Sequence, residues 1–300
     1  MTRGRAGGTT DRVPAPLMVL VAIASVQTGS AVARGLFDEL GAAGVTLLRL
    51  ALAAVVVLAV TRPAVRGWQR AQWQAAALLG AAMAGMNLTF YLALRTVPLG
   101  VAVTVEFVGP LLLALVQTRR AVDLAWAALA FGGVVLLGAD SLGAASTTPL
   151  SGLLLALIAG LFWAGYILAS ARLGQAVPGV DGLGVALAVA AVLVLPLGAG
   201  GAVGLLDRPS LLMVAGLVAL LSSVIPYGLE LTALRQLPTR VFGVLMSLEP
   251  AAAAAAGLVL LRQALGTREL VALLLVSVAS AGVTLGRRGR RGAAPVQPLD

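Results

Sequence analysis

Residues 93–98 read Ala-Leu-Arg-Thr-Val-Pro and residues 233–238 read Ala-Leu-Arg-Gln-Leu-Pro, so one short motif occurs twice, 140 positions apart. Twelve residues after the proline of each motif stands a second proline, Pro110 and Pro250. The same shift of 140 relates Gly44-Val45 to Gly184-Val185. A repeat that covers nearly half of the chain indicates two copies of one structural unit. In a membrane protein, this predicts a transporter with its site between two halves.

The composition is that of a membrane protein. Of the 300 residues, 60% are hydrophobic and 11% are charged, and the mean hydropathy is +1.01. Apolar stretches follow one another from Leu17 to Leu285, and each is long enough to cross a hydrocarbon core of ~30 Å at ~1.5 Å per helical residue. The sequence therefore predicts an all-α polytopic membrane protein. Its ten predicted transmembrane helices are 16–35, 42–60, 74–95, 98–116, 122–139, 151–171, 182–199, 211–234, 238–261 and 268–286.

The net charge of +9 comes from arginine alone, and most of the 21 arginines stand in short loops and tails. Such a distribution sets membrane orientation and does not indicate a nucleic-acid partner. With the N-terminus inside, fifteen arginines are cytoplasmic and five are external. We therefore predict that both termini are cytoplasmic. Because each half contributes five helices, the second half enters the membrane inverted relative to the first.

The repeat also predicts the organisation of the chain. We expect a disordered N-terminal tail at 1–15, a first five-helix repeat at 16–139, a second at 151–286, and a basic C-terminal tail at 287–300. The arginines before the first apolar run are also typical of a cleavable signal peptide. However, cleavage would remove the counterpart of residues 151–171, so the repeat favours retention of the first helix.

Several classes of chemistry have no residues here to support them. The chain contains neither cysteine nor histidine, which excludes disulfides, Cys/His zinc sites, Ser-His dyads and cysteine nucleophiles. No ATP-binding loop or cofactor motif is present. The sequence accordingly predicts no catalytic residue, no metal site, no cofactor and no enzymatic activity.

Four ionisable residues stand at membrane depth, away from the first and last residues of the predicted helices: Arg49, Glu106, Glu230 and Glu249. A charge at membrane depth costs ~2.5–3.5 kcal/mol on insertion scales, so such residues are presumed functional. Burial favours the neutral form of a carboxyl group, as a proton carrier requires. We therefore predict that Glu106, Glu249 and Glu230 couple transport to protons.

The second proline of each repeated motif, Pro110 or Pro250, bears directly on one of these glutamates. Pro110 cannot donate a hydrogen bond to the carbonyl of Glu106, and Pro250 cannot donate to that of Met246. We therefore expect a local kink and a free carbonyl beside each glutamate, facing a cavity or the protein interior.

Polar and aromatic side chains on other helices can complete a cavity. Asn87 and Tyr91 are four residues apart, so they form one polar stripe on an otherwise apolar helix. Ser30, Tyr166 and Ser223 are further polar companions. The predicted substrate-binding residues are Gln27, Arg49, Asn87, Tyr91, Trp163 and Tyr227.

Structural roles compete with several of these assignments. Arg49 is also interpretable as a buried ion-pair partner of Glu106 and Glu249 that only holds the bundle together. Glu230 stands near the end of its helix, within reach of Arg95 or Arg235. Trp163 is equally typical of packing against lipid.

The chain resembles the EamA-domain exporters of the drug/metabolite transporter superfamily, and among them most closely the bacterial threonine/homoserine exporters. The resemblance covers about residues 17–286 and is carried by Val26-Gln27-Thr28-Gly29, residues 44–52, Gly85-Met86-Asn87, residues 96–103 with Glu106-Phe107 and Gly109-Pro110, and residues 237–240 with Phe242-Gly243 and Met246-Ser247-Leu248-Glu249-Pro250. It implies ten helices in two inverted EamA repeats in a bacterial inner (plasma) membrane. One difference stands out, because Arg262-Gln263 replaces the Gly-Glu that members often carry near the end of the ninth helix.

Together, the residues and the resemblance predict a secondary exporter of small amino acids or metabolites, coupled to protons and working by alternating access. Its expected partners are that small molecule, protons and the lipid bilayer, and the expected state is a monomer or homodimer. A broader drug/metabolite efflux transporter is the first alternative. The second is a non-transporting scaffold or receptor, which would have no reason to keep glutamates near the membrane midplane.

Overall fold

The computed structural model describes residues 14–116, 121–141, 149–177, 181–234, 236–237 and 239–286. Within these ranges every regular element is helical. The elements are α1 (Ala15–Arg34), α2 (Phe37–Thr61), η1 (Val65–Gly67), α3 (Arg70–Ala93), α4 (Leu99–Glu106), α5 (Val108–Val116), α6 (Ala121–Ser141), α7 (Leu150–Ala176), α8 (Asp181–Ala202), α9 (Gly204–Asp207), α10 (Ser210–Ala219), η2 (Leu220–Val224), α11 (Ile225–Leu234), α12 (Thr239–Met246), α13 (Glu249–Leu261) and α14 (Thr267–Gly286).

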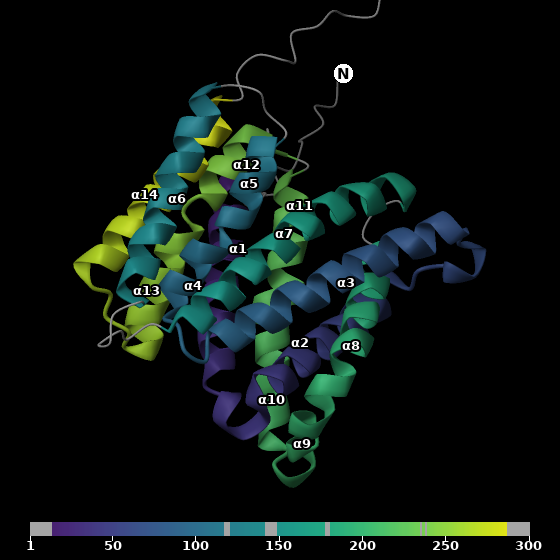
Figure 1. The fold of residues 1–300 in the computed structure, drawn as a ribbon. Coiled ribbons are helices and arrows are strands. Elements are labelled where there is room, and N and C mark those ends of the chain that lie inside the picture. The colour runs from purple at the N-terminus through teal and green to yellow at the C-terminus, as the bar shows by residue number, and fades with distance from the viewer. Residues whose placement is uncertain are drawn as a thin grey trace, which may run out of the picture.

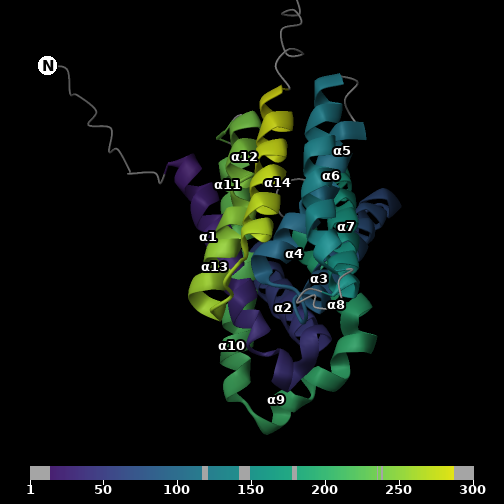
Figure 2. The ribbon, with the colours of Figure 1, turned by 60° about the vertical axis from the view of Figure 1, so that its left-hand side comes forward.

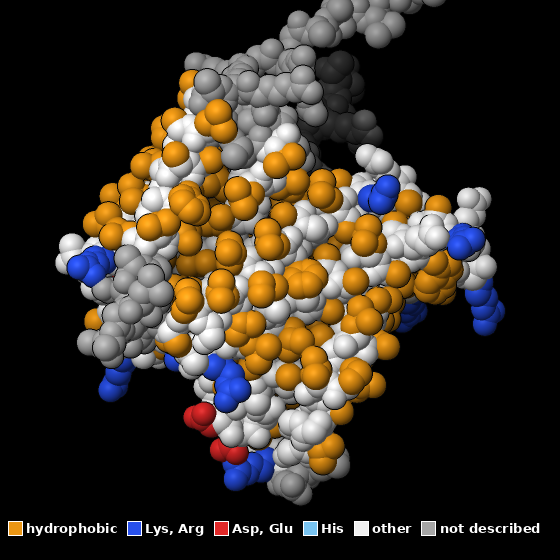
Figure 3. Space-filling view, viewed as in Figure 1, with side chains coloured by type: hydrophobic (Ala, Val, Ile, Leu, Met, Phe, Trp, Pro, Cys, Tyr) orange, Lys and Arg blue, Asp and Glu red, His pale blue; other side chains and the backbone are white. Residues whose placement is uncertain are grey.

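The predicted all-helical, multi-pass architecture is confirmed. In the described part of the chain, eight helices or helix runs are long and apolar enough to cross a membrane. The α4–α5 and α6 segments contain shorter apolar helices, Leu99–Leu113 and Leu124–Leu137. Hydrophobic side chains cover most of the face seen in Figure 3, and arginines stand at its margins. This surface is that of a protein surrounded by lipid.

The helices pack across the two halves of the chain. The main pairs are α2 with α8, α3 with α7, α6 with α14, α3 with α8, α1 with α11, and α4 with α13, and each joins a helix from one half to a helix from the other. In Figure 1, α6 and α14 stand together on one side, and α2, α3, α7 and α8 cross the other. Figure 2 shows the same neighbours from another direction. If the helices of the two halves are matched in order, α1 corresponds to α7, α2 to α8, α3 to the α10–α11 run, the α4–α5 run to the α12–α13 run and α6 to α14. Exchange of the halves then turns α3–α7 into α1–α11 and turns the less evenly matched pair α3–α8 into α2–α10.

Small residues permit this close packing. The Cβ atom that a side chain on Gly201 of α8 would carry lies 1.9 Å from the Leu40 carbonyl oxygen of α2, and Gly44 lies opposite on α2. Only glycine fits so close to another backbone, and such contacts are a common device where helices associate in membranes.

Contacts at the helix ends join segments that the sequence predicts on the same side. At the predicted external end, the Arg34 guanidinium donates to the carbonyls of Leu94 and Val97, and Arg208 pairs with Glu39. At the predicted cytoplasmic end, the Gln72 amide donates to the Ala176 carbonyl over 3.0 Å. These contacts join neighbouring helix ends, and the side of the membrane on which each end lies stays a prediction.

Three predicted helices are interrupted. Segment 98–116 breaks at Phe107 between α4 and α5, and segment 238–261 breaks at Ser247 and Leu248 between α12 and α13. These two breaks lie where the prolines led us to expect kinks. The third, within 211–234, is a π-helical turn, η2, which was not predicted.

Candidate functional site

The helices bring a set of polar side chains together in the interior. We define the central polar cluster as Gln27 of α1, Arg49 of α2, Tyr91 of α3, Glu106 of α4, Ser222 and Ser223 of η2, and Glu249 of α13. All seven residues are buried. They come from both halves of the chain, as a site between two repeats requires.

Arg49 is held by hydrogen bonds to η2 and α3. Its Nε donates to Ser223 Oγ over 3.0 Å, and its Nη2 donates to the Ser222 carbonyl over 2.6 Å. Nη1 donates to the Tyr91 hydroxyl over 3.0 Å, with the guanidinium 5.3 Å from that ring's centroid. No ion pair joins Arg49 to Glu106 or Glu249. The hydrogen bonds therefore favour a structural role for Arg49. This role differs from the ion pair with Glu106 or Glu249 that the sequence also allowed.

The π-helical turn η2 explains how the Ser222 carbonyl becomes available. Pro226 stands four residues after Ser222 and lacks the N–H that would bond this carbonyl in an α-helix. The adjacent Leu221 carbonyl accepts a hydrogen bond from Ser25 Oγ over 2.7 Å. Turns of this kind occur frequently at functional sites. Sequence reasoning missed Ser25, Ser222 and this turn, although Pro226 gives the same signal as Pro110 and Pro250.

The two glutamates stand at the two proline-associated breaks. Glu106 is the last residue of α4, and Glu249 is the first residue of α13. Glu106 interacts electrostatically with both Glu249 and Arg49, so the three charges belong to one site. Among the buried residues that the structure describes, one positive charge, Arg49, stands against two carboxyl groups. If both glutamates are ionised, this site lacks one positive charge.

Glu249 has one hydrogen-bond partner, Gln27. Gln27 Nε2 donates to Glu249 Oε1 over 3.2 Å, which joins α1 of the first half to α13 of the second. The other oxygen of each side chain, Gln27 Oε1 and Glu249 Oε2, is buried and has no partner in the structure. A buried acceptor without a donor costs ~1–3 kcal/mol.

Tyr227 and Glu230 of α11 border the cluster. The ring of Tyr227 stacks on that of Tyr166, with centroids 6.3 Å apart and planes at 28°. Tyr227 also interacts electrostatically with Arg49 and Glu230. Glu230 is half-buried and forms no ion pair with Arg95, which is exposed; Arg235 lies outside the described residues.

The contacts of Trp163 and Asn87 are with residues other than Arg49, Glu106 and Glu249. Trp163 of α7 is partly buried, and its ring meets that of Phe107 edge-on, with centroids 5.0 Å apart. It therefore packs at the α4–α5 break and not simply against lipid. Asn87 is buried, and its Nδ2 donates to the Met83 carbonyl of its own helix over 2.7 Å.

A contact between α5 and α7 fixes the backbone beside Glu106. A Cβ on Gly109 would lie 1.8 Å from the Gly160 carbonyl oxygen, and a Cβ on Gly160 would lie 2.3 Å from the Glu106 carbonyl oxygen. The two backbones thus touch directly at the α4–α5 break. A side chain at either glycine would push the α4–α5 segment, which contains Glu106, away from α7.

Gln263, one of the two residues that differ from the family pattern, connects the halves. Its Oε1 accepts a hydrogen bond of 2.9 Å from the Leu99 backbone N–H, in the first turn of α4. The side chain thus caps the helix that ends at Glu106. A neutral carboxamide is sufficient for this contact.

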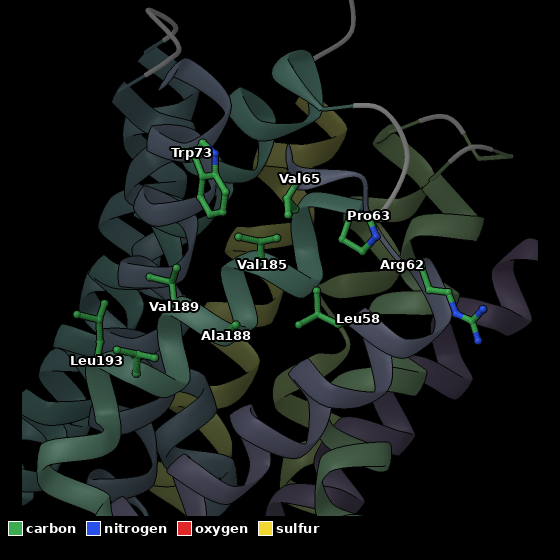
Figure 4. A pocket seen from close by; sticks show the side chains of 10 residues that line it. Leu58, Arg62, Pro63, Val65, Trp73, Val185, Ala188, Val189 and Leu193 are labelled. Carbon is green, nitrogen blue, oxygen red and sulfur yellow. The ribbon is translucent and has the colours of Figure 1, made fainter. Parts of the chain in front are cut away.

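A pocket between α2, α3 and α8 lies away from the central polar cluster. It has a volume of about 640 Å³ and is lined mainly by apolar side chains of α2, α3 and α8, including Leu58, Trp73 and Val189, with Arg62 among its residues. Figure 4 shows these side chains around the pocket. None of the cluster residues lines it, so we do not assign it to the candidate site.

Comparison with known proteins identifies relatives over nearly the whole chain. Residues 150–285 match the EamA-like transporter family. The threonine/homoserine exporter RhtA of Salmonella typhimurium (strain LT2) is 42% identical over 284 residues, which cover 93% of this chain and 95% of that protein. The exporter of the same name from Escherichia coli (strain K12) is 42% identical over 272 residues, which cover 90% of each chain.

A solved crystal structure shares the fold at 19% sequence identity. Its TM-score is 0.52, and the match covers 91% of this chain and 98% of that one. Because the sequence identity is low, this likeness concerns the arrangement of helices alone. From the long match to the curated relatives, the chain belongs to the EamA-like transporter family.

Proposed function

We propose that the protein is a secondary active exporter of small amino acids related to threonine and homoserine, driven by proton entry. The observation that carries the proposal is the central polar cluster, which holds one guanidinium and two carboxyl groups between the two halves. A zwitterionic substrate and a proton both need such groups at membrane depth. The relatives named as threonine/homoserine exporters, 42% identical over at least 90% of the chain, support this substrate class.

The proposed architecture is ten membrane crossings in two inverted five-helix EamA repeats, residues 16–139 and 151–286. The exchange symmetry of the helix pairs and the contacts at the helix ends support it. Both tails are cytoplasmic, in the bacterial inner (plasma) membrane, and the working unit is a monomer or homodimer. Rocking of one half against the other exposes the cluster alternately to the two sides.

The proposed mechanism uses the missing positive charge of the cluster. With Arg49 and two ionised glutamates, the site gains electrostatically from taking up one cation. A proton on a glutamate supplies that charge on the inward journey. On the outward journey the ammonium group of the zwitterionic substrate pairs with a glutamate carboxylate in place of the proton's charge. Because protonation of the cluster and binding of the ammonium group disfavour each other electrostatically, export of one amino acid is linked to entry of one proton.

The test is export from cells. Cells that express the protein are expected to tolerate excess threonine or homoserine better than control cells, and labelled threonine is expected to leave them faster. Dissipating the proton gradient should stop export against a concentration gradient. If neither amino acid leaves faster but an unrelated drug does, the protein is a broader efflux transporter. If nothing leaves faster, the exporter assignment is wrong.

A further inference from the structure

Gln27 and Glu249 form a site with unused hydrogen-bonding capacity. Gln27 is 3% exposed and Glu249 is 8% exposed, so both side chains are more than nine-tenths buried. They share one hydrogen bond, from Nε2 to Oε1 over 3.2 Å. The remaining oxygens, Gln27 Oε1 and Glu249 Oε2, are shielded from solvent and accept nothing.

The chemistry of these two oxygens specifies what is missing. Both are acceptors, so the absent group is a donor; when the carboxyl group of Glu249 is ionised, that donor must also carry positive charge. A neutral water molecule could donate to both oxygens but would leave the charge uncompensated. The described residues contain no group of three or more acidic, histidine or cysteine side chains that could hold a metal ion. Two oxygens fall short of the six to eight ligands that a calcium ion takes, for example.

The groups that could compensate Glu249 from neighbouring helices do not do so. Glu106 and Glu230, which both interact with Glu249, are themselves acidic. The nitrogens of Arg49 are bonded to Tyr91, Ser222 and Ser223, so the guanidinium is committed to η2 and α3. A cation for Glu249 must therefore come from outside the chain.

We propose that Gln27 Oε1 and Glu249 Oε2 form the subsite for the substrate's primary ammonium group. This inference rests on the proposed function and names one part of its site. An ammonium group brings the missing charge and at least two N–H donors for the two oxygens. Gln27 acts as the specificity-determining residue, because its amide nitrogen orients the carboxylate while its oxygen supplies the second acceptor. Glu106, which lacks such a partner, is left for the proton.

The subsite predicts which analogues bind. Replacing the amine of threonine by a hydroxyl removes the charge and leaves at least one buried acceptor without a donor. Such a mismatch is discriminated strongly, because the polar groups of the site are left unpaired. By contrast, replacing the carboxylate of threonine by an alcohol leaves the ammonium group and its two contacts intact.

The experiment measures binding to the purified full chain in detergent, through the ligand-induced rise of its melting temperature. The probes are L-threonine, the amino alcohol that lacks the carboxylate, and the dihydroxy acid that lacks the amine. Threonine and the amino alcohol are expected to stabilise the wild-type protein, and the dihydroxy acid is not. Gln27→Leu is expected to weaken the apparent affinity for both amines by about 10- to 100-fold, since a hydrogen bond to a charged group is lost.

Two controls separate this prediction from a general effect on folding. Ser277→Ala removes another buried hydroxyl without a partner, on α14 outside the cluster, and should leave all three probes unchanged. Gln27→Glu keeps an acceptor oxygen at the same position but removes the amide nitrogen that bonds Glu249 and adds a third acidic group to the cluster, so it should weaken amine binding less than Gln27→Leu does. If Gln27→Leu fails to fold, Gln27→Met tests the same loss with an unbranched side chain.

The outcomes distinguish the subsite from the proposed function. If Gln27→Leu binds amines as the wild type does, or if the dihydroxy acid binds as well as threonine, the ammonium subsite is wrong, even where cells export threonine. If cells export no threonine but amines still bind through Gln27, the subsite stands and the proposed substrate is wrong. If no amine stabilises the wild-type protein, the subsite is overturned.

Discussion

At the scale of single residues, the charged groups of the cluster have different surroundings. Arg49 is fixed by three hydrogen bonds, whereas Glu249 has only Gln27. Glu106 interacts with the other two charges through space. Because Arg49 forms no ion pair with either glutamate, neutralising one glutamate does not strand a bonded arginine. This makes the glutamates accessible to conservative substitution.

We expect Glu106→Gln to uncouple export from the proton gradient. Glutamine keeps the shape of the side chain and cannot titrate, so the site then holds one positive and one negative charge and needs no proton. The variant should fold, since a neutral amide is cheaper at membrane depth than a charge. In proteoliposomes with an imposed proton gradient, threonine should approach equal concentrations on the two sides, while exchange of labelled for unlabelled threonine continues.

The matched control is Glu39→Gln, the same substitution at an exposed glutamate outside the cluster. It should leave proton-driven accumulation unchanged. We expect Glu249→Gln to be the more damaging of the two central substitutions, because that carboxyl group also has a direct partner in Gln27. Continued proton-driven accumulation by Glu106→Gln would show that Glu106 carries no coupled proton.

At the scale of the helices, proline and glycine determine where the polar backbone lies. Pro110, Pro226 and Pro250 each remove one backbone hydrogen bond, and each stands beside an irregular turn in the membrane interior. The released carbonyl of Ser222 is bonded by Arg49. The carbonyl of Glu106 lies against Gly160, so the α4–α5 break is packed into α7. Irregular backbone is thus buried in protein, as the bilayer requires.

Gly109→Ala should destabilise the protein by about 1–3 kcal/mol or more, because the new methyl group overlaps the Gly160 carbonyl oxygen. Thermal unfolding in detergent measures the change. The control is Gly216→Ala on α10, where nothing lies within 4 Å of the added Cβ. Because alanine loses less conformational freedom on folding than glycine does, that variant should be neutral or more stable by up to ~1 kcal/mol. Equal melting temperatures for the two variants would mean that α5 and α7 do not touch at this point.

At the scale of the whole molecule, contacts between the halves must change if the site is to open alternately. At the predicted external end, α4 and α13 are joined by the Gln263 cap on Leu99 and by the close approach of Gly257 to Leu99. These two helices carry Glu106 and Glu249. Their separation at this end is therefore a natural way to open the cluster to the outside.

A disulfide between positions 99 and 257 should block export. The Cβ built on Gly257 lies 3.6 Å from the Cβ of Leu99, and disulfides join Cβ atoms ~3.5–4.5 Å apart. The chain contains no cysteine of its own, so a double Leu99→Cys, Gly257→Cys variant forms one defined cross-link. Oxidation should stop threonine efflux, and reduction should restore it. The single variants are the controls, and unimpaired efflux by the oxidised double variant would exclude opening between these helices.

The orientation of the bundle is testable with topology reporters. Reporters fused after Pro63 and Arg120 should read as cytoplasmic, and those fused after Asp140 and Pro209 as external, because the arginine-rich loops are retained inside. A reporter is also expected to read as cytoplasmic at the C-terminus. A cytoplasmic signal after Asp140 would contradict the inverted arrangement of the two halves.

The sequence alone predicted the membrane class, an internal repeat of short motifs, irregular backbone beside Glu106 and Glu249, and most residues of the central polar cluster. These features are local: hydropathy acts over one helix length, and a proline removes a bond four residues away. Pro226 predicts a lost backbone bond but not a π-helical turn, since Pro196 stands within the α-helix α8 without one. Sequence and resemblance together identified the family that the curated relatives then showed.

The tertiary structure decided which groups meet. Arg49 is bonded to Ser222 and Ser223, 173 and 174 residues away, and Gln27 to Glu249, 222 residues away. Such pairs depend on how ten apolar segments of similar composition pack, and hydropathy does not distinguish one packing from another. Steric fit does, because the glycines that let α2 approach α8 and α5 approach α7 fix the rotation of each helix. Gly29 likewise lets α1, which carries Gln27, approach Ser222 of η2, and Gly100 lets α4 approach α13, which carries Glu249.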